Sequence, residues 1–125
     1  MEKPIEVIFL KQAEEFTNSI ENNPKKKLFQ AIRKTKDRLF GQWFTKLKSS
    51  DRIFEFRVDD SGKFYRLFAF WDTQGKEETL VVATHGLIKK TNKTPPAEIR
   101  KAEQIKRNYF EEKKKDKKNK SSKEL

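Results

Sequence analysis

The stretch that decides the fold reads RIFEFRVDDSGKFYRLFAFW and covers residues 52–71. In residues 52–58 every second side chain is apolar, which is the period of a β-strand with one buried face. The tetrapeptide Asp59-Asp60-Ser61-Gly62 supplies typical turn residues, and residues 63–71 continue as a second strand that is largely apolar on both faces. The stretch therefore predicts a β-hairpin with a short turn.

The flanking sequence extends this hairpin into a mixed domain. Residues 79–84 predict a third strand after a turn at Asp72-Thr73-Gln74-Gly75, which makes an antiparallel meander. Upstream, residues 5–10 predict a strand covered on both faces. A helix is expected from Lys11 to about residue 21.

A second helix is expected from Pro24, with Asn23 as its cap, to near Gly41. Thr94-Pro95-Pro96 opens a last helix. The prediction is an α+β fold of order β-α-α-β-β-β-α. It has a small, mostly antiparallel sheet, a helical hairpin packed on it and a C-terminal helix.

Composition limits the chemistry that this chain can perform. Its 125 residues suit one small domain. The absence of Cys removes disulfides, thiolate nucleophiles and sulfur-based zinc sites, and a single His, His85, excludes multi-histidine metal sites. No phosphate loop or metalloprotease motif is present, so neither a metal nor a small-molecule cofactor is expected.

The chain contains no apolar run of 18 residues, so no membrane span is expected. Residues 1–6, MEKPIE, lack the basic end and apolar stretch of a secretory signal. The sequence thus predicts a soluble, cytoplasmic protein.

The net charge of +11 is spread over the whole chain. We expect a domain at 1–112 and a Lys-rich, disordered tail at 113–125, because the tail has almost no apolar residue to bury. Residues 1–110 alone carry a net charge of +8. This charge favours the binding of a polyanion, and nucleic acid is the leading candidate for the partner.

Arg66 lies in the middle of an otherwise aromatic and aliphatic strand, where an unpaired guanidinium is costly to bury. Glu55 on the neighbouring strand offers a structural partner, and an open face that waits for an anion is an equally good interpretation. Arg57 shares a face with Glu55 and adds a second guanidinium. Two arginines on adjacent strands favour a phosphate clamp.

Further basic residues come from other segments. Lys89 and Lys90 follow the third strand of the meander, where a connecting loop would leave them at the edge of the sheet. A cluster drawn from separate segments is the pattern that RNA phosphates require. The candidate RNA-binding residues that join this cluster are Lys46, Lys48 and Lys93.

His85 and Tyr109 are the candidates for proton transfer. His85 is the one side chain whose ordinary pKa lies near neutrality, although a single His at the end of a strand more often has a structural role. Tyr109 lies in the apolar stripe of the last helix, which favours core packing. The acids Asp59, Asp60 and Asp72 are expected to form turns rather than a magnesium site.

These residues resemble a known family. The pattern consists of the Glu-x-Arg strand at Glu55-Phe56-Arg57, then Tyr65-Arg66, then Gly86-Leu87-Ile88-Lys89-Lys90, and finally Thr94-Pro95. It is similar to the phage-derived, HigB-like branch of the RelE/ParE toxin superfamily of bacterial type II toxin-antitoxin systems. The resemblance covers about residues 5–112.

The resemblance implies a RelE-like fold and a metal-independent endoribonuclease, an mRNA interferase, that cuts mRNA in the ribosomal A site and inhibits translation. Attack by the 2′-hydroxyl would leave a 2′,3′-cyclic phosphate and a 5′-hydroxyl. Arg57 and Arg66 match the strand arginines of the motif, and Lys89 and Lys90 match its basic pair. It also implies a cognate antitoxin, often a helix-turn-helix protein.

Three alternatives stay open from the sequence. The first is a ParE-like inhibitor of DNA gyrase that cuts nothing. The second is a non-catalytic RNA- or ribosome-binding module. The third is a fold in which Arg66 and Glu55 form an internal pair without any ligand.

Overall fold

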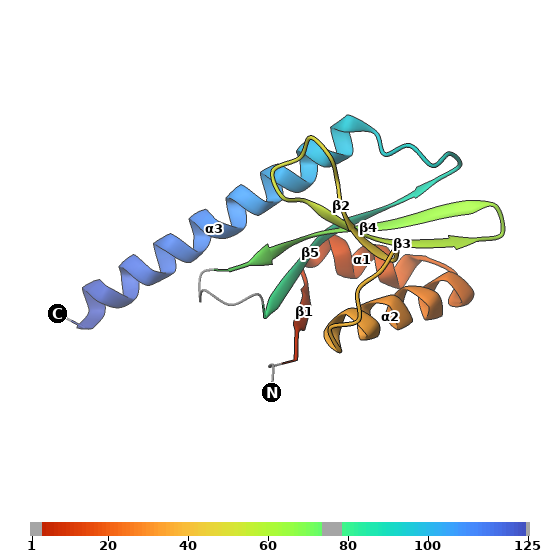
Figure 1. Cartoon of the computed structure of the whole chain (residues 1–125). Helices are drawn as coiled ribbons and strands as arrows, with labels where there is room; N and C mark the ends of the chain where they lie inside the picture. Colours follow the sequence, from red (N-terminus) through yellow and green to blue (C-terminus); the bar gives the residue numbers. More distant parts are fainter. Residues whose placement is uncertain (1–3, 74–78, 125) are drawn as a thin grey trace.

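The computed structural model describes residues 4–73 and 79–124 and has the expected α+β architecture (Figure 1). Its five-stranded sheet has the order β1-β5-β4-β3-β2, with β1 parallel to β5 and the other neighbours antiparallel. The elements are β1 (Glu6–Phe9), α1 (Lys11–Ser19), α2 (Asn22–Lys36), β2 (Phe44–Lys46), β3 (Phe54–Asp60), β4 (Lys63–Asp72), β5 (Leu80–Lys89) and α3 (Pro96–Glu124).

The predicted hairpin is confirmed as β3 and β4. Their two-residue turn is Ser61-Gly62, and both residues have a positive φ, 50° and 77°. Positive φ at both positions matches the twist of the flanking strands. The resulting register sets Arg57 directly opposite Arg66 and sets Asp60 opposite Lys63.

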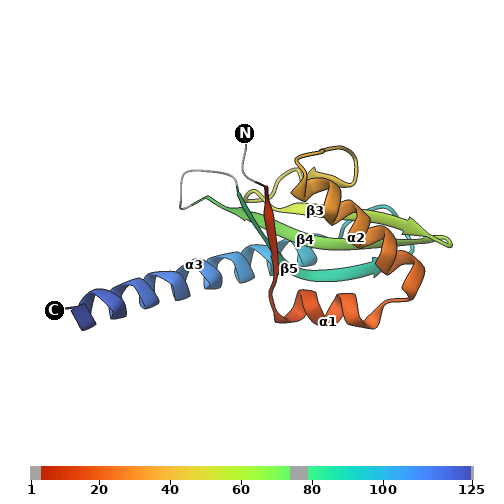
Figure 2. The same cartoon turned by 90° about the horizontal axis from the view of Figure 1, so that it is seen from below.

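The helices cover both faces of the sheet (Figure 2). Helices α1 and α2 pack on one face as the expected hairpin and bury Ala13 and Leu28 against it. The N-terminal half of α3 packs on the opposite face through Ala102. Gly86 of β5 faces α1, because a Cβ added there would lie 2.1 Å from the ring of Phe16. Side chains alternate along a strand, so His85 and Leu87 face the α3 side.

The structure corrects several boundaries. Strand β2 was not predicted, because three residues are too few to show a period. Strand β5 continues through Gly86 to Lys89, so Lys89 belongs to the sheet rather than to a loop. Helix α2 ends at Lys36, and neither Asn23 nor any other side chain caps its start.

Two further expectations differ in detail. Strand β1 lies at the edge of the sheet and leaves Ile8 39% exposed, so it is not covered on both faces. In the turn predicted at residues 72–75, Asp72 is instead the last residue of β4, and Gln74 and Gly75 lie outside the described residues.

Helix α3 runs through the Lys-rich segment that was expected to be disordered and projects beyond the sheet (Figure 1). Lys and Glu are good helix formers, and an ion pair between Lys115 and Glu112 joins successive turns of this part. Helical structure therefore needs no apolar partner here. The division into a domain and a tail at residue 112 stays a prediction. None of the helices in the described part has the length and apolar character to cross a membrane.

Candidate functional site

Arg66 lies in the middle of β4 on the α3 side of the sheet, and none of its side-chain surface is exposed. Its Nη1 donates to the carbonyl oxygen of Tyr65 at 2.9 Å and to Oδ1 of Asp59 at 3.1 Å. Its Nε has no hydrogen-bond partner among the described residues and lies 3.8 Å from Oε1 of Glu55. The guanidinium is thus held in place by acceptors on two strands.

Asn92, in the loop between β5 and α3, joins the two arginines. Its Oδ1 accepts hydrogen bonds from Nη2 of Arg66 at 3.0 Å and from Nη2 of Arg57 at 3.1 Å. Both guanidiniums therefore converge on one oxygen atom. Two cationic donors around one oxygen form the arrangement that arginines also make with a phosphate oxygen.

Lys89 and Glu55 complete this group. Nζ of Lys89 donates to Oγ1 of Thr94 at 2.9 Å and to the carbonyl oxygen of Asn92 at 3.2 Å. Oγ1 of Thr94 in turn donates a hydrogen bond to Oε2 of Glu55 at 3.3 Å. We use the name Arg66 cluster for Glu55, Arg57, Arg66, Lys89 and Asn92.

The charges of the Arg66 cluster are nearly but not fully balanced. Its three cations face the carboxylates of Glu55 and Asp59, so one positive charge is in excess. Burial, with a further contribution from Arg66 and Arg57, lowers the pKa of Lys89, and Glu55 opposes this change. A cationic group that gives up its proton more easily is suited to proton transfer.

The other predicted lysines lie on the surface. Lys90 and Lys93 are exposed in the same loop as Asn92, and Lys48 is exposed after β2. Lys46 is exposed in β2 and lines a pocket at the opposite end of β3 from the hairpin turn. Lys90 and Lys93 thus lie in the loop that carries Asn92 of the Arg66 cluster, whereas Lys46 lies at a separate pocket.

His85 lies close to the Arg66 cluster in β5, two residues before Leu87, which is opposite Arg66. Both ring nitrogens are engaged: Nε2 is 2.8 Å from Oε2 of Glu98, and Nδ1 is 3.1 Å from Oγ1 of Thr84. Burial lowers the pKa of His85 despite the hydrogen bond with Glu98. These contacts fasten the first turns of α3 to the sheet, which favours the structural role.

The lowered pKa of His85 predicts a dependence of stability on pH. Below about pH 6.5 the unfolded chain takes up a proton at His85 that the folded protein resists. We therefore expect the free energy of unfolding to fall as the pH drops from about 7 to about 5, by at most about 1.4 kcal/mol per pH unit.

Urea unfolding at a series of pH values measures this slope. The variant His85→Gln is the control, since it keeps a hydrogen-bonding side chain but cannot titrate. The same slope in the variant would assign the pH dependence to other groups.

Tyr109 lies far from the Arg66 cluster. Its hydroxyl donates to Oδ2 of Asp72 at 2.7 Å, and Lys113 binds the same oxygen. Asp72 follows Arg66 by six residues in β4, which corresponds to about 20 Å. Asp72 is buried and fastens α3 to the sheet, so it is not the turn residue that was predicted.

Asp59 and Asp60 also differ from simple turn residues. Asp59 lies in β3 and pairs with Arg66, as described above, while Asp60 pairs with Lys27 of α2 at 2.9 Å. The hydrogen bond with Lys27 lowers the pKa of Asp60. In the described ranges, no three His, Cys, Asp or Glu side chains are grouped so that they could hold a metal ion.

Sequence reasoning missed Asn92 and Thr94 as members of the site. Asn92 and Thr94 flank Lys93, and residues of these types are typical of any loop. Thr94 belongs to the Thr-Pro part of the family pattern, and the one signal for Asn92 was its place between the basic pair and the last helix.

A comparison with family models finds a match over most of the chain. The model described as phage derived protein Gp49-like (DUF891) matches residues 15–107, which include the whole Arg66 cluster. No curated protein sequence matches the chain. The match covers most of the chain and the fold agrees with it, so this protein belongs to the Gp49-like family of phage-derived proteins, a RelE/HigB-like toxin family.

Proposed function

We propose that this protein is the toxin of a type II toxin-antitoxin system and that it cuts mRNA on the ribosome. The observation that carries the proposal is the convergence of Arg57 and Arg66 on the single oxygen Oδ1 of Asn92. A phosphate oxygen that replaces this amide oxygen would meet two guanidiniums. The excess positive charge of the Arg66 cluster would attract it.

The reaction needs no metal because RNA carries its own nucleophile. The 2′-oxygen attacks the adjacent phosphorus and loses its proton, while the bond between phosphorus and the 5′-oxygen breaks. The products are a 2′,3′-cyclic phosphate and a 5′-hydroxyl, which takes up a proton. Arg57 and Arg66 stabilise the charge that grows on the phosphoryl oxygens, the largest contribution that such a site can make.

Lys89 is the proton-transfer group that the contacts favour. It is 7% exposed, its pKa is lowered, and it lies in the same network as both arginines. Lys90, exposed in the loop that follows β5, positions the RNA backbone. The engaged nitrogens of His85 and the distance of Tyr109 make both weaker candidates for the acid or the base.

Binding of phosphate requires the loop that carries Asn92 to move. We expect Asn92→Ala to lower the free energy of unfolding by about 1–3 kcal/mol, because two hydrogen bonds to charged groups are lost. Inorganic phosphate should restore more stability to this variant than to the wild type, since the anion takes the place of the amide oxygen.

Thermal unfolding with and without phosphate measures both effects. Asn18→Ala, at an exposed position of α1, is the matched control. Equal stabilisation of the two variants by phosphate would contradict the exchange of amide oxygen for phosphate.

The proposed function includes a cognate antitoxin, because a chain that cuts mRNA must be held inactive. Its expected type is a helix-turn-helix protein. A toxin that acts on translating ribosomes works in the cytoplasm.

The decisive experiment adds the purified protein to a translating extract and maps new 5′ ends on one mRNA. The same mRNA without ribosomes is the control. We expect cuts at codon spacing only in the translating sample. Intact mRNA in both samples, with the protein shown to be folded, would contradict the proposal.

A non-catalytic RNA-binding role is the second candidate. One observation favours it: Arg66 is fully buried and is already bound by protein acceptors. A structural Arg66 would leave a basic surface that holds RNA without cutting it. In the experiment above, such a protein would bind ribosomes with a steep dependence on salt and leave the mRNA intact.

A further inference from the structure

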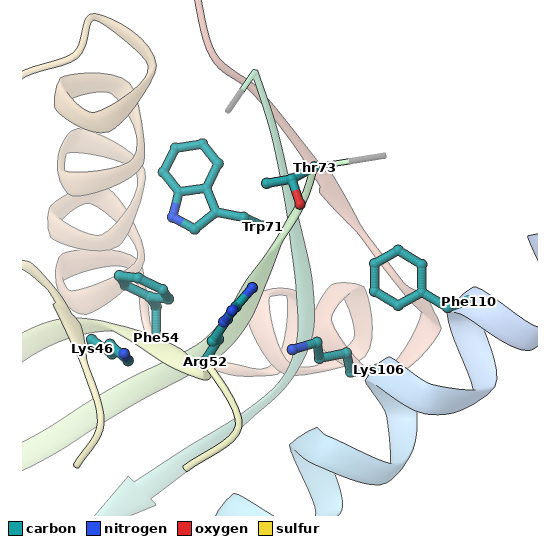
Figure 3. Close-up of a pocket in the computed structure, with 7 residues that line it drawn as sticks. All are labelled: Lys46, Arg52, Phe54, Trp71, Thr73, Lys106 and Phe110. Carbon is teal, nitrogen blue, oxygen red and sulfur yellow. The ribbon is translucent and has the colours of Figure 1, made fainter. Parts of the chain in front are cut away.

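The pocket that Lys46 lines lies at the opposite end of β3 from the hairpin turn, and Figure 3 shows its lining residues. Its volume is about 360 Å³, within the range of sites that hold small ligands. Three aromatic rings, those of Phe54, Trp71 and Phe110, and three cations line it. The cations are Lys46, Arg52 and Lys106.

This pocket is separate from the Arg66 cluster. Trp71 follows Arg66 by five residues in β4, about 16 Å along the strand. Phe54 is the neighbour of Glu55, but successive side chains of a strand point to opposite faces. The two sites share no residue, so each can be altered without touching the other.

The aromatic rings are held in place by packing. The ring of Phe54 stacks on Phe44 with the centroids 5.0 Å apart and meets the edge of Trp71 at 6.5 Å. Phe110 packs on Phe70 at 5.5 Å from the α3 side. Trp71 and Phe110 are nonetheless only partly buried, so they present fixed aromatic surface to a ligand.

The cations are available to an anion. Among the described residues, neither Lys46 nor Arg52 has a hydrogen-bond or ion-pair partner. Lys106 is held by the carbonyl oxygen of Asp51 at 2.8 Å and directs its ammonium group into the pocket (Figure 3). No carboxylate lies among the described residues that line the pocket, but the carboxylate of Asp51 beside it is 3.6 Å from Nζ of Lys106. The positive charges of Lys46 and Arg52 are therefore the two that no described carboxylate opposes.

Aromatic faces next to free cations match the chemistry of one nucleotide, a flat ring joined to a phosphate. We infer that this pocket binds one nucleotide of a single-stranded RNA, with the base against Trp71 and the phosphate on Arg52 and Lys46. The hydroxyl of Thr73 is the one neutral polar side chain in the described lining, so little selection between bases is expected. The identity of the ligand as RNA rests on the proposed function. The pocket and its chemistry do not depend on it.

Trp71 reports on its own pocket by fluorescence. The other tryptophan, Trp43, has a buried Nε1 without a hydrogen-bond partner among the described residues, so Trp43→Phe is expected to be tolerated. In this background the probe is a single-stranded DNA of six deoxyadenosines. It has no 2′-hydroxyl and cannot be cut, whereas stacking and charge do not require ribose.

We expect the probe to quench Trp71. The pair Arg52→Gln and Lys46→Gln should raise the Kd at least about tenfold. The control pair Lys25→Gln and Lys26→Gln removes the same charge from α2 and should change the Kd less than about twofold. An equal rise in Kd for the two pairs would mean that only the net charge of the protein matters, which would overturn the inference.

Polyphosphate tests the role of the base, because it carries charge without rings. It should bind the protein without quenching Trp71. If polyphosphate quenched Trp71 as strongly as the DNA does, the inference would be overturned. It would also be overturned if saturating DNA did not quench Trp71. Arg57→Gln should keep the quench, so failure of mRNA cleavage and failure of this pocket are distinguishable.

Discussion

Arg57→Gln is expected to lower the rate of mRNA cleavage by about 10²–10³-fold, the usual effect of removing one donor to a transition-state oxyanion. Arg57 is the arginine of the Arg66 cluster that reaches solvent, with 32% of its side chain exposed. A phosphate that approaches the sheet therefore meets Arg57 first. The measurement is the rate at which new 5′ ends appear in a translating extract.

The fold should tolerate this change. The ion pair between Arg57 and Glu55, at 3.6 Å, is partly exposed, and such pairs contribute less than about 1 kcal/mol. Arg57→Lys keeps the charge but loses the planar fork, so it should recover only part of the activity. Arg33→Gln, on the exposed surface of α2, removes the same charge elsewhere and should cut at the wild-type rate. An undiminished rate for Arg57→Gln would remove Arg57 from the mechanism.

The sheet was predictable because its central strands carry a strong local signal. Residues 54–58 alternate with the period of a strand, and residues 63–71 are largely apolar on both faces, as suits a central strand. Ser61-Gly62 can adopt the positive φ values that the turn requires. The same is true of α1 and α2, whose apolar stripes fit one face of the sheet. Local patterns also predicted that Tyr109 packs in the core, where it contacts Phe70 at 5.3 Å.

What the sequence could not show are contacts that depend on tertiary structure. Gly86 is typical of a turn, yet here it lies within β5 because Phe16 of α1 leaves no room for a Cβ. Asp72 is typical of a turn too, but α3 returns to it from more than 30 residues away. Asn92 has no distinguishing pattern, because its role depends on Arg57 and Arg66 lying side by side across two strands.

Arg66→Gln is expected to lower the free energy of unfolding by about 3–5 kcal/mol. The substitution removes the buried positive charge that pairs with Glu55 and Asp59. Among the described residues, Glu55, 6% exposed, would keep its contacts with Arg57 and the hydroxyl of Thr94 and the nearby charge of Lys89. Domains of this size are stable by about 5–15 kcal/mol, so the variant should be folded but fragile. Urea unfolding measures the loss.

Glu55→Gln should cost clearly less, which distinguishes the two interpretations of Arg66. Without Glu55, the guanidinium still binds Asp59 and Asn92, as well as the carbonyl oxygen of Tyr65. Arg66 is thus held independently of Glu55, so the pair with Glu55 does not by itself explain the position of Arg66. Equal losses for the two variants, with a double variant no worse than either, would mean that Arg66 and Glu55 are only each other's partners. In that case the stability of the sheet alone would explain Arg66, and the case for a phosphate site would depend on Arg57 and Lys89.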